Sequence, residues 1–490
     1  MIPDLRARLR SYADAFGAED EEIHPSMIAN GEACDFLVSR IPLLDCPDKT
    51  IEKTYYYRWW TLRKHWKDTP DGHILTEFAP PVGWAGAYNS INAAAGHHIR
   101  EARWMNAPEN WTKEYISFWL DRKGNSLLYS MWYAAAAESY LDLHPDPVFE
   151  AGCLDRLVSL WEDREKMNLH PCGLFWSDDG YDAMELSISG SGIRPTMNSY
   201  MIADAEAISR MAARAGRFGL SKRFAERAAQ LKEKMDLLLW DGDFYKVIPC
   251  GRDEAFPADK RPPVPAEHDV REQIGYIPWY FSIPSAEKST AFGLLTDEAG
   301  FRAPYGITTA ERSHPRFMFA HPHECLWNGP VWPYATAQTL TALANHLREN
   351  GEVCVTKKDY YALLKQYAAS HRIVLEDGRE VMWIDEDMDP FTGEWIARKQ
   401  LRADNPNPGA GVVERGKDYN HSTFCDLVLS GLLGIGARDG RLRADPLIPE
   451  DWDWFCVTNL PPYGQSVVFD RTGERYGLGA GLMILGGVTG

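Results

Sequence analysis

The sequence lacks several features that would place it in a specialised class of protein. It has no run of about eighteen apolar residues, so no membrane-spanning helix is expected. Its 52 Lys and Arg are outnumbered by 70 Asp and Glu. The resulting net charge of -18 argues against a nucleic-acid or anionic-membrane partner, because both repel an acidic surface. Residues 1–22 contain no apolar core of the kind that a secretory signal needs, so we expect a cytoplasmic location, unless an export signal has been removed.

Metal ligands at recognisable spacing are also missing. The nine cysteines are odd in number and include no C-x-x-C pair, which indicates reduced, mostly buried thiols. The neighbours His97 and His98 point in different directions on a helix, and no acidic partner lies at ligand spacing. The acidic run 385–389 lacks the glycine and the glutamate of a calcium-binding EF-hand loop. We therefore expect no metal and no cofactor.

Helical periodicity is present through most of the chain. The segment 250–270 is rich in proline and charged residues, which indicates an exposed insertion. No repeat period of a solenoid is visible, so many helical hairpins must close into a ring to bury their apolar faces. The expected fold is all-α, a toroid of helical hairpins. The segments predicted to be helical include 111–121, 125–142, 147–166, 197–215, 221–239, 285–296, 331–348, 357–371 and 420–435.

A change of pattern near the C-terminus predicts the domain organisation. Residues after about 440 alternate between apolar and polar side chains and turn frequently, as short strands do. We expect one catalytic domain over residues 1–440, in which 1–80 supply N-terminal helices and a leading segment. The β-rich segment 441–490 is expected to pack on that domain.

Two acidic loops about two hundred residues apart carry the main functional signal. The stretch 173–200 places Asp178, Asp179, Asp182 and Glu185 beside aromatic residues, with little regular periodicity. The second loop, 381–395, contains Glu386 and three aspartates ahead of a Pro-Phe-Thr-Gly turn. A solvated acidic turn is the alternative for each loop. Paired carboxylates on separate loops suit hydrolysis of a glycosidic bond.

Aromatic residues strengthen the link to carbohydrate. The chain has 18 Trp, and several of them lie beside polar turn residues rather than in apolar runs. Indole rings stack on the apolar faces of sugars, although core packing explains most tryptophans in proteins. Two more loops of this character are 323–333 and 415–424.

Three motifs in order resemble the glycoside hydrolase family 63-type group. They are WNGPVWPYATAQTL from Trp327, the Gly-Tyr-Asp that ends at Asp182 with its following Asn-Ser-Tyr, and the E-x-x-x-P-x-T-G that begins at Glu386. The group includes mannosylglycerate hydrolase-like and trehalase-like glycosidases on an (α/α)6 barrel, and the resemblance extends from about residue 80 to 435. It implies that Asp182 is the general acid, that Glu386 is the general base, and that the anomeric configuration is inverted.

The resemblance has departures that limit what it implies. Ala183, Met184 and Glu185 follow Asp182, where the mannosylglycerate hydrolases have an Asn/Asp-Ser-Pro type of sequence. The sugar specificity therefore does not carry over, and Asp179 and Glu185 stay open as alternatives for the acid.

The predicted activity is hydrolysis of an oligosaccharide or small glycoside, by exo action. Carbohydrate is the expected partner, and the sequence does not determine the oligomeric state. For each residue expected to contact the sugar, core packing or helix capping is the alternative. These residues are Trp84, Trp176, Arg194, Asn198, Glu272, Tyr276, Trp279, Glu324, Trp327, Asn328 and His421.

Other activities remain possible on the same helical scaffold. A polysaccharide lyase would use His421, Tyr419 and Arg415 to remove a proton next to a uronate, and its product absorbs ultraviolet light. A sugar epimerase would use paired histidines and release no reducing end. Its candidates are His97, His98, His321 and His323. A sugar-binding module without activity seldom needs so long a chain.

Overall fold

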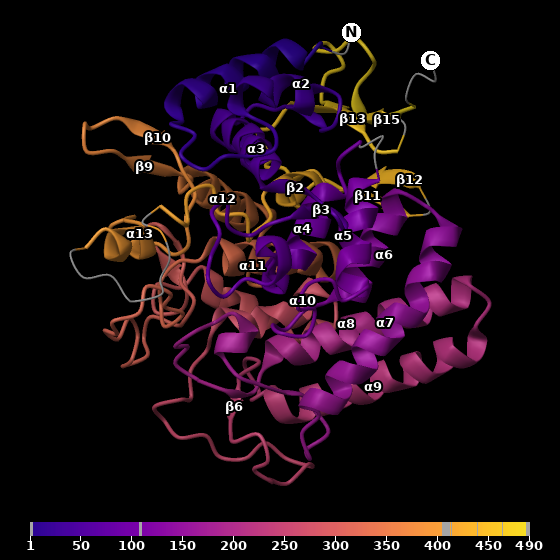
Figure 1. The fold of residues 1–490 in the computed structure, drawn as a ribbon, viewed down its shortest axis with the longest axis vertical. Helices are drawn as coiled ribbons and strands as arrows, with labels where there is room; N and C mark the ends of the chain where they lie inside the picture. The colour runs from indigo at the N-terminus through magenta and orange to yellow at the C-terminus, as the bar shows by residue number, and fades with distance from the viewer. Residues whose placement is uncertain are drawn as a thin grey trace.

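The computed structural model describes residues 3–106, 110–403, 412, 414–438, 440–462 and 464–486. Within these ranges the chain is mainly helical, as predicted (Figure 1). None of the described helices is both long enough and apolar enough to cross a membrane. The α-helices are α1 (Arg6–Glu19), α2 (Ala33–Val38), α3 (Lys49–Leu62), α4 (Ala95–Ala102), α5 (Trp111–Leu120), α6 (Tyr133–Leu143), α7 (Pro147–Asn168), α8 (Pro195–Arg214), α9 (Phe218–Leu239), α10 (Ile277–Tyr280), α11 (Pro333–Asn350), α12 (Lys357–Ala369) and α13 (Ile396–Leu401).

Local sequence signals explain where several helices begin. Asp146 caps α7 by accepting a hydrogen bond from the backbone N–H of Phe149 at 3.0 Å, and Pro147 occupies the first turn. The α12 helix begins with a capping box, in which the side chains of Thr356 and Asp359 each accept a hydrogen bond from the other's backbone N–H. The predicted starts of α7, α11 and α12 lie within two residues of the observed ones.

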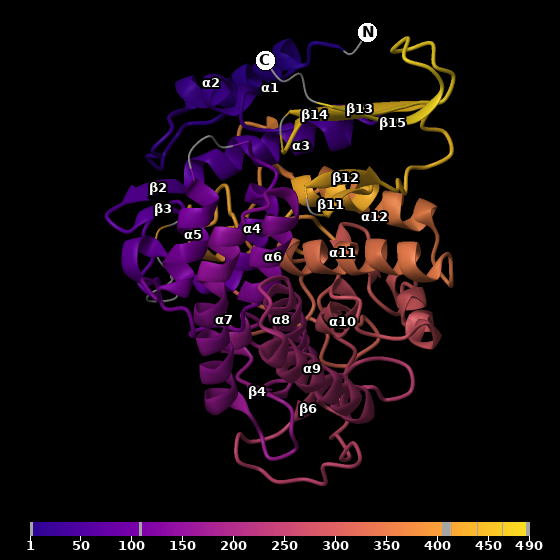
Figure 2. The ribbon, with the colours of Figure 1, turned by 90° about the vertical axis from the view of Figure 1, so that its right-hand side faces the viewer.

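Short strands accompany the helices. The C-terminal part of the chain forms a sheet in the order β1-β13-β14-β15, which lies at the same end of the molecule as α1–α3 (Figure 2). The strand β1 belongs to the N-terminal part, so this sheet joins residues about four hundred positions apart. The strands are β1 (Leu43–Asp45), β2 (Trp66–Thr69), β3 (Gly72–Leu75), β4 (Trp176–Ser177), β5 (Gly192–Ile193), β6 (Ile248–Pro249), β7 (Arg302–Ala303), β8 (Gly306–Ile307), β9 (Arg372–Val374), β10 (Glu380–Met382), β11 (Ile435–Arg438), β12 (Arg441–Ala444), β13 (Trp454–Leu460), β14 (Gln465–Asp470) and β15 (Gly481–Leu485).

The predicted boundary at residue 440 falls inside the antiparallel β11–β12 hairpin. The hairpin begins before the boundary and ends after it, and the adjoining sheet includes an N-terminal strand. The division of the chain into two domains at this position stays a prediction. Residues 250–270, which follow β6, contain no helix or strand, and they are largely exposed, as predicted for an insertion.

One predicted helix starts later than its periodicity indicates. The segment 125–142 was expected to be helical throughout, but α6 begins at Tyr133. The side chain of Asn92 holds the preceding turn, because it donates to the carbonyl of Tyr129 at 3.0 Å and accepts from the same residue's N–H at 3.1 Å. This side-chain clamp leaves residues 125–132 irregular and fixes the position of Tyr129.

The predicted helix at 420–435 is also shorter than expected. Only a short helical turn and a π-helix, η8 (Leu427–Leu432), form in this region. The buried carboxylate of Glu101 accepts hydrogen bonds from three successive backbone N–H groups, those of Phe424, Cys425 and Asp426, at 2.6 to 2.9 Å. Glu101 thereby ends the loop 415–424 and starts the helical turn.

A buried ion cluster joins α4 to η8. The carboxylate of Asp426 pairs with Arg100 at 3.0 Å and with Arg103 at 2.6 Å, and it accepts a hydrogen bond from the indole of Trp104 at 2.7 Å. Burial alone would raise the pKa of Asp426, but the two guanidinium groups hold this pKa well below its ordinary range. The cluster connects segments more than three hundred residues apart.

We predict that Asp426→Asn destabilises the fold by about 3 kcal/mol, because it leaves two buried guanidinium groups without their anion. Asp155→Asn removes an exposed partner of Arg217 and is the control, with an expected loss below about 1 kcal/mol. Urea unfolding at pH 7 measures both.

The pKa of Asp426 is lowered on folding, so the stability that it contributes is present above the pKa of the unfolded carboxyl group. The deficit of Asp426→Asn should therefore shrink as the pH falls below about 4. Equal losses for the two variants would contradict the role of the cluster.

Candidate active site

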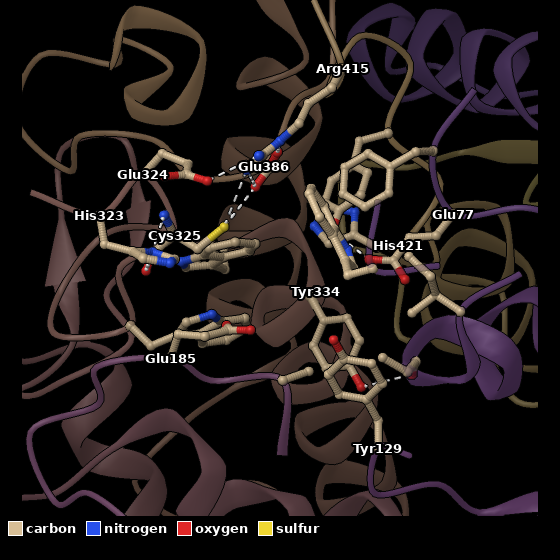
Figure 3. Close-up of a pocket in the computed structure, with 18 residues that line it drawn as sticks. Glu77, Tyr129, Glu185, His323, Glu324, Cys325, Tyr334, Glu386, Arg415 and His421 are labelled. Atoms are coloured by element: carbon tan, nitrogen blue, oxygen red, sulfur yellow. Dashed lines mark hydrogen bonds and ion pairs between the residues drawn. The ribbon is translucent and has the colours of Figure 1, made fainter. Parts of the chain in front are cut away.

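An open pocket of about 270 Å³ lies where several irregular segments meet. Its walls come from residues 77–93, from Tyr129, from the loop after α7, from the segment that leads into α11, and from the two loops at 386 and 415–421 (Figure 3). The described lining residues are Glu77, Phe78, Trp84, Ile91, Ala93, Tyr129, Ala183, Glu185, His323, Glu324, Cys325, Trp327, Trp332, Tyr334, Glu386, Arg415, Tyr419 and His421.

A buried ion cluster forms one wall of the pocket. Arg415 donates from Nε to Oε1 of Glu386 at 2.6 Å and from Nη2 to Oε2 of the same carboxylate at 3.0 Å. Its Nη1 donates to Oε1 of Glu324 at 2.9 Å. A guanidinium group stays protonated in proteins, and it bonds both oxygens of Glu386, so this carboxylate is ionised. In Figure 3 the three side chains lie together in the upper part of the view.

The aspartates on either side of Glu386 have structural roles. Asp385 accepts a hydrogen bond from the indole of Trp383 at 3.1 Å, and Asp387 accepts from the backbone N–H of Ala397 at 3.0 Å, at the start of α13. These two contacts anchor the loop on both sides of Glu386. They leave Glu386 as the acid of this loop that lines the pocket.

The thiol of Cys325 is part of the same cluster. Its Sγ lies 2.9 Å from Oε2 of Glu386 and 3.5 Å from Nη2 of Arg415. Burial raises the pKa of the Cys325 thiol well above its ordinary value, and the charge of Glu386 raises it further. The thiol therefore stays protonated at neutral pH and donates a hydrogen bond to Glu386.

Glu185 lies across the pocket from Glu386 as drawn in Figure 3. Burial raises its pKa to about 7, and the negative charges of Glu386 and Asp179 contribute in the same direction. Its neighbours Ala183 and Leu186 adopt left-handed backbone conformations, with φ of 57° and 61°. Such strain in residues other than glycine costs free energy and is concentrated at functional sites. A half-buried carboxyl group held in this way is suited to carry a proton near neutral pH.

Glu77, the fourth carboxyl group of the lining, is paired with Tyr419. The phenol of Tyr419 donates a hydrogen bond to Oε1 of Glu77, while Oε2 has no partner within the described part of the chain. Burial raises the pKa of Glu77 to about 8; the hydrogen bond from Tyr419 lowers it, and the charges of Glu386 and Glu185 raise it further. The backbone N–H of Asn420 donates to the carbonyl of Glu77 at 3.0 Å and joins the two segments.

Aromatic rings and one histidine complete the lining. Trp327 stacks on Trp332 with ring centroids 4.3 Å apart, and Trp84 is 36% exposed at the mouth. His421 stacks on Tyr419 at 3.7 Å, and neither of its ring nitrogens has a hydrogen-bond partner among the described residues. Burial lowers the pKa of His421 well below its ordinary value, so the ring is neutral and offers one donor and one acceptor. These groups can stack on a sugar ring and bond its hydroxyl groups.

Asp182 does not line the pocket, contrary to the prediction that it faces Glu386. Its carboxylate accepts a hydrogen bond from Nε of Arg194 at 2.7 Å, and both side chains are fully inaccessible to solvent. Arg194 also donates to the hydroxyl of Ser187 at 3.2 Å and to the carbonyl of Gly190. The pair therefore fixes the course of the loop that presents Glu185, and neither member reaches the cavity.

Three more predicted contacts serve loops near Asp182. Trp176 lies in β4 and donates to the carbonyl of Cys250 at 2.8 Å. Asn198 is buried in α8 and bonds the backbone of Phe175, with distances of 2.8 and 3.0 Å. Glu272 is buried and accepts from the N–H of Ile188 at 2.8 Å. None of the three predicted residues is among the lining residues, because each satisfies backbone groups of neighbouring loops.

The remaining predicted contacts outside the pocket belong to the core or to a loop. Tyr276 and Trp279 are buried among aromatic rings, and the Tyr276 phenol donates to the carbonyl of Ala291 at 2.9 Å. Asn328 donates to the carbonyl of Phe319 at 2.8 Å and holds the segment that precedes α11. Of the predicted set, Trp84, Glu324, Trp327, His421 and Glu386 do line the pocket.

Several lining residues were not assigned to a hydrolase site from the sequence. Glu77 and Tyr129 lie in none of the motifs, whereas His323 and Cys325 lie in the loop 323–333 and Tyr334 in the motif from Trp327, but none of the five was given a role in hydrolysis. Arg415 and Tyr419 were noted, but as parts of a lyase. For Glu185 the sequence did carry a signal, because this residue lies in the acidic stretch 173–200 and is an alternative to Asp182 as the general acid.

No arrangement of three or more His, Cys, Asp or Glu side chains suited to a metal ion occurs among the described residues. His97 is buried without a partner for its ring nitrogens, and His98 bonds the phenol of Tyr115 at 2.7 Å. Neither histidine lines the pocket. His321 does not line the pocket either. Of the four histidines considered for an epimerase, His323 alone belongs to the described lining.

Comparison with known proteins identifies the family. A model of the mannosylglycerate hydrolase MGH1-like glycoside hydrolase domain matches residues 87–422, which is more than two thirds of the chain. The chain belongs to this family. The prediction of a glycosidase is therefore confirmed at the level of the family, and a glycoside hydrolase of this family acts on carbohydrate. A search of curated proteins finds no match.

Solved structures extend the comparison. A protein described as a sialidase is 35% identical, with a TM-score of 0.87 over 98% of this chain and 43% of that one. This chain thus spans less than half the length of that protein. The GH63 mannosylglycerate hydrolase from Thermus thermophilus in complex with glucose is 12% identical, with a TM-score of 0.51 over 76% of this chain and 98% of that one. The GH78 rhamnosidase of a Bacillus species is 14% identical, with a TM-score of 0.54 over 87% and 40% of the two chains. The last two likenesses concern the fold alone.

The hydrogen bond from Cys325 to Glu386 can be tested in this family member. Cys325→Val removes the donor at similar volume, and we predict a fall in kcat/KM of about tenfold, because one oxygen of Glu386 loses a partner. Cys325→Ser keeps a donor and should stay within about threefold of the wild type. The control is Cys354→Ser, which changes an exposed thiol. The measurement is kcat/KM on any glycoside that the wild type hydrolyses. Equal kcat/KM of the Val and Ser variants would contradict a role for the hydrogen bond from Cys325 to Glu386.

Proposed function

We propose that the protein is an exo-acting, inverting glycoside hydrolase on an (α/α)6 barrel, with Glu185 as the general acid and Glu386 as the general base. The single observation that carries the proposal is that two carboxyl groups line one pocket in contrasting environments. Glu386 is bonded through both oxygens to Arg415, whereas the pKa of Glu185 is raised to about 7. Environments that separate the pKa values of two carboxyl groups assign the acid and the base.

The proposed reaction uses the two groups in one step. Glu185 donates its proton to the glycosidic oxygen as the bond to the anomeric carbon breaks. Glu386 accepts a proton from a water molecule that attacks the opposite face of that carbon. The stacked Trp327 and Trp332 and the exposed Trp84 supply apolar surface for the sugar. The names of the relatives, a sialidase, a mannosylglycerate hydrolase and a rhamnosidase, do not fix the sugar of this chain.

The proposal for the fold rests on the helical hairpins and on the family. Helices α8 and α9 pack as a pair, as do α11 and α12, and similar folds are found in a GH63 and a GH78 enzyme. Exo action is supported by the small volume of the pocket, about 270 Å³, which suits a single terminal unit.

We predict that Glu185→Gln and Glu386→Gln each lower kcat by at least about a hundredfold, because each removes a proton-transfer group from the transition state. A screen of nitrophenyl glycosides and oligosaccharides identifies a substrate, and NMR of the first product anomer tests inversion. Near-wild-type turnover by either variant would exclude that residue from its role.

Asp182→Asn is the matched comparison, since it neutralises an acid of the same loop. It should lower the melting temperature, because Arg194 loses its buried anion. The protein that remains folded should keep a larger part of its activity than Glu185→Gln does. The reverse order of activities would return the acid role to Asp182.

The pH profile supplies an independent test of Glu185. A general acid must hold its proton, so kcat/KM should fall as the pH rises through about 7, the pKa of Glu185. Glu185→Gln has no proton to lose, and its residual activity should lack this alkaline limb. If Glu185→Gln keeps the same alkaline limb, another group must cause it. Glu77 is then the first candidate, because its pKa is also raised.

A further inference from the structure

The charge of the pocket lining is strongly one-sided. Four carboxyl groups line it, those of Glu77, Glu185, Glu324 and Glu386. Among the described lining residues, Arg415 is the one Lys or Arg side chain. A ligand that enters therefore meets mainly acidic groups, whatever the protonation of Glu185 and Glu77 at a given pH.

The positive charge of Arg415 is already shared between two anions. Glu386 takes the bonds from Nε and Nη2, at 2.6 and 3.0 Å, and Glu324 takes the bond from Nη1 at 2.9 Å. Side chains of all three residues are at most 6% exposed. A substrate carboxylate would have to displace one of these buried anions to reach the guanidinium group, and the displaced carboxylate would lose its bond to Arg415 while still buried.

The two histidines of the lining carry no permanent charge, unlike Arg415. His421 is buried and neutral, as described above. The Nδ1 atom of His323 lies 3.0 Å from both the backbone nitrogen and the backbone oxygen of Cys325, so the main chain engages one of its two ring nitrogens.

The other surfaces of the pocket suit a ligand without charge. Trp327 and Trp332 offer stacked indole rings, and Trp84 is exposed at the mouth. The ring nitrogens of His421 have no hydrogen-bond partner in the part of the chain that the structure describes, so one can donate to a hydroxyl group and the other can accept from one. Hydroxyl groups satisfy such buried polar atoms without bringing a charge into the cavity.

We propose that the glycosyl unit bound in this pocket is a neutral sugar, and that sugars whose ring carries a carboxylate, the uronic and sialic acids, are excluded. The inference rests on the proposed function, because it concerns the unit on which Glu185 and Glu386 act. It concerns that unit alone and leaves the rest of the substrate open. An acidic sugar is excluded because its carboxylate has the same charge as the lining glutamates, and Arg415 is already bonded to two of them. The pocket thus discriminates between sugars by repulsion rather than by shape.

Matched sugar pairs test the inference directly. The nitrophenyl glucosides and galactosides are compared with the corresponding glucuronides and galacturonides in both anomers, together with a sialoside. We expect the neutral member of a cleaved pair to have a kcat/KM at least about a hundredfold higher. In parallel, quenching of tryptophan fluorescence compares glucose with glucuronate and galactose with galacturonate. Equal or better hydrolysis or binding of an acidic sugar would overturn the inference.

A charge variant tests the cause. Glu324→Gln removes one anion from the cluster, and the ratio of uronide to neutral-glycoside kcat/KM should rise by about tenfold. Glu233→Gln makes the same change at an exposed position of α9 and should leave the ratio unchanged. An unchanged ratio in Glu324→Gln, with the wild-type preference intact, would contradict the electrostatic explanation.

The two proposals fail in different ways. Hydrolysis of a uronide that Glu185→Gln abolishes would overturn the inference and leave the proposed function standing. Binding of neutral sugars, without hydrolysis of any glycoside, would support the inference and contradict the proposed function.

Discussion

The bonds from Arg415 to Glu386 and Glu324 are the interaction on which the pocket depends. A buried guanidinium group needs anions, and both of its anions come from loops distant in the sequence. The segment before α11, the loop before α13 and the loop 415–424 must therefore meet at one point. Burial raises the pKa values of Glu185 and Glu77 to about 7 and about 8. The negative charge of Glu386 adds to both shifts, and the positive charge of Arg415 opposes them.

A second layer of buried polar groups holds these loops in place. Asn92 clamps the turn that carries Tyr129, and Glu101 caps the helical turn after the loop 415–424. The pair of Asp182 and Arg194 fixes the loop of Glu185. Each of these groups satisfies backbone or charged partners away from water, so the cost of its burial is offset by hydrogen bonds. Buried hydrogen bonds and ion pairs thus hold the irregular segments in place, and a fixed scaffold can aim the side chains of a site.

The sequence predicted the elements of the fold better than the side chains of the site. Helical periodicity and caps located α7, α8, α9, α11 and α12, because these signals act within a few residues. The start of α6 was missed, since the competing bonds from Asn92 come from a residue more than thirty positions away. Asp182, Arg194, Asn198 and Glu272 are polar residues in or beside the loop 173–200 or near it in the fold, but no sequence pattern distinguishes a side chain that faces a cavity from one that bonds the backbone behind it. Glu185 was identified only as an alternative, since its distinction from Asp182 lies in which of them Arg194 reaches.

The distribution of a single positive charge links the chemistry of the pocket to its specificity. Arg415 bonds both oxygens of Glu386, whereas burial and the charge of Glu386 raise the pKa of Glu185 to about 7 against the opposing charge of Arg415. A second cation in the cavity would attract acidic sugars, but it would also lower the pKa of Glu185 and remove the proton that an acid catalyst must donate. Proton donation at neutral pH and recognition of a carboxylate therefore oppose each other in a pocket of this size. The acidic lining favours the first, and it also favours the positive charge that develops on a sugar ring as the glycosidic bond breaks.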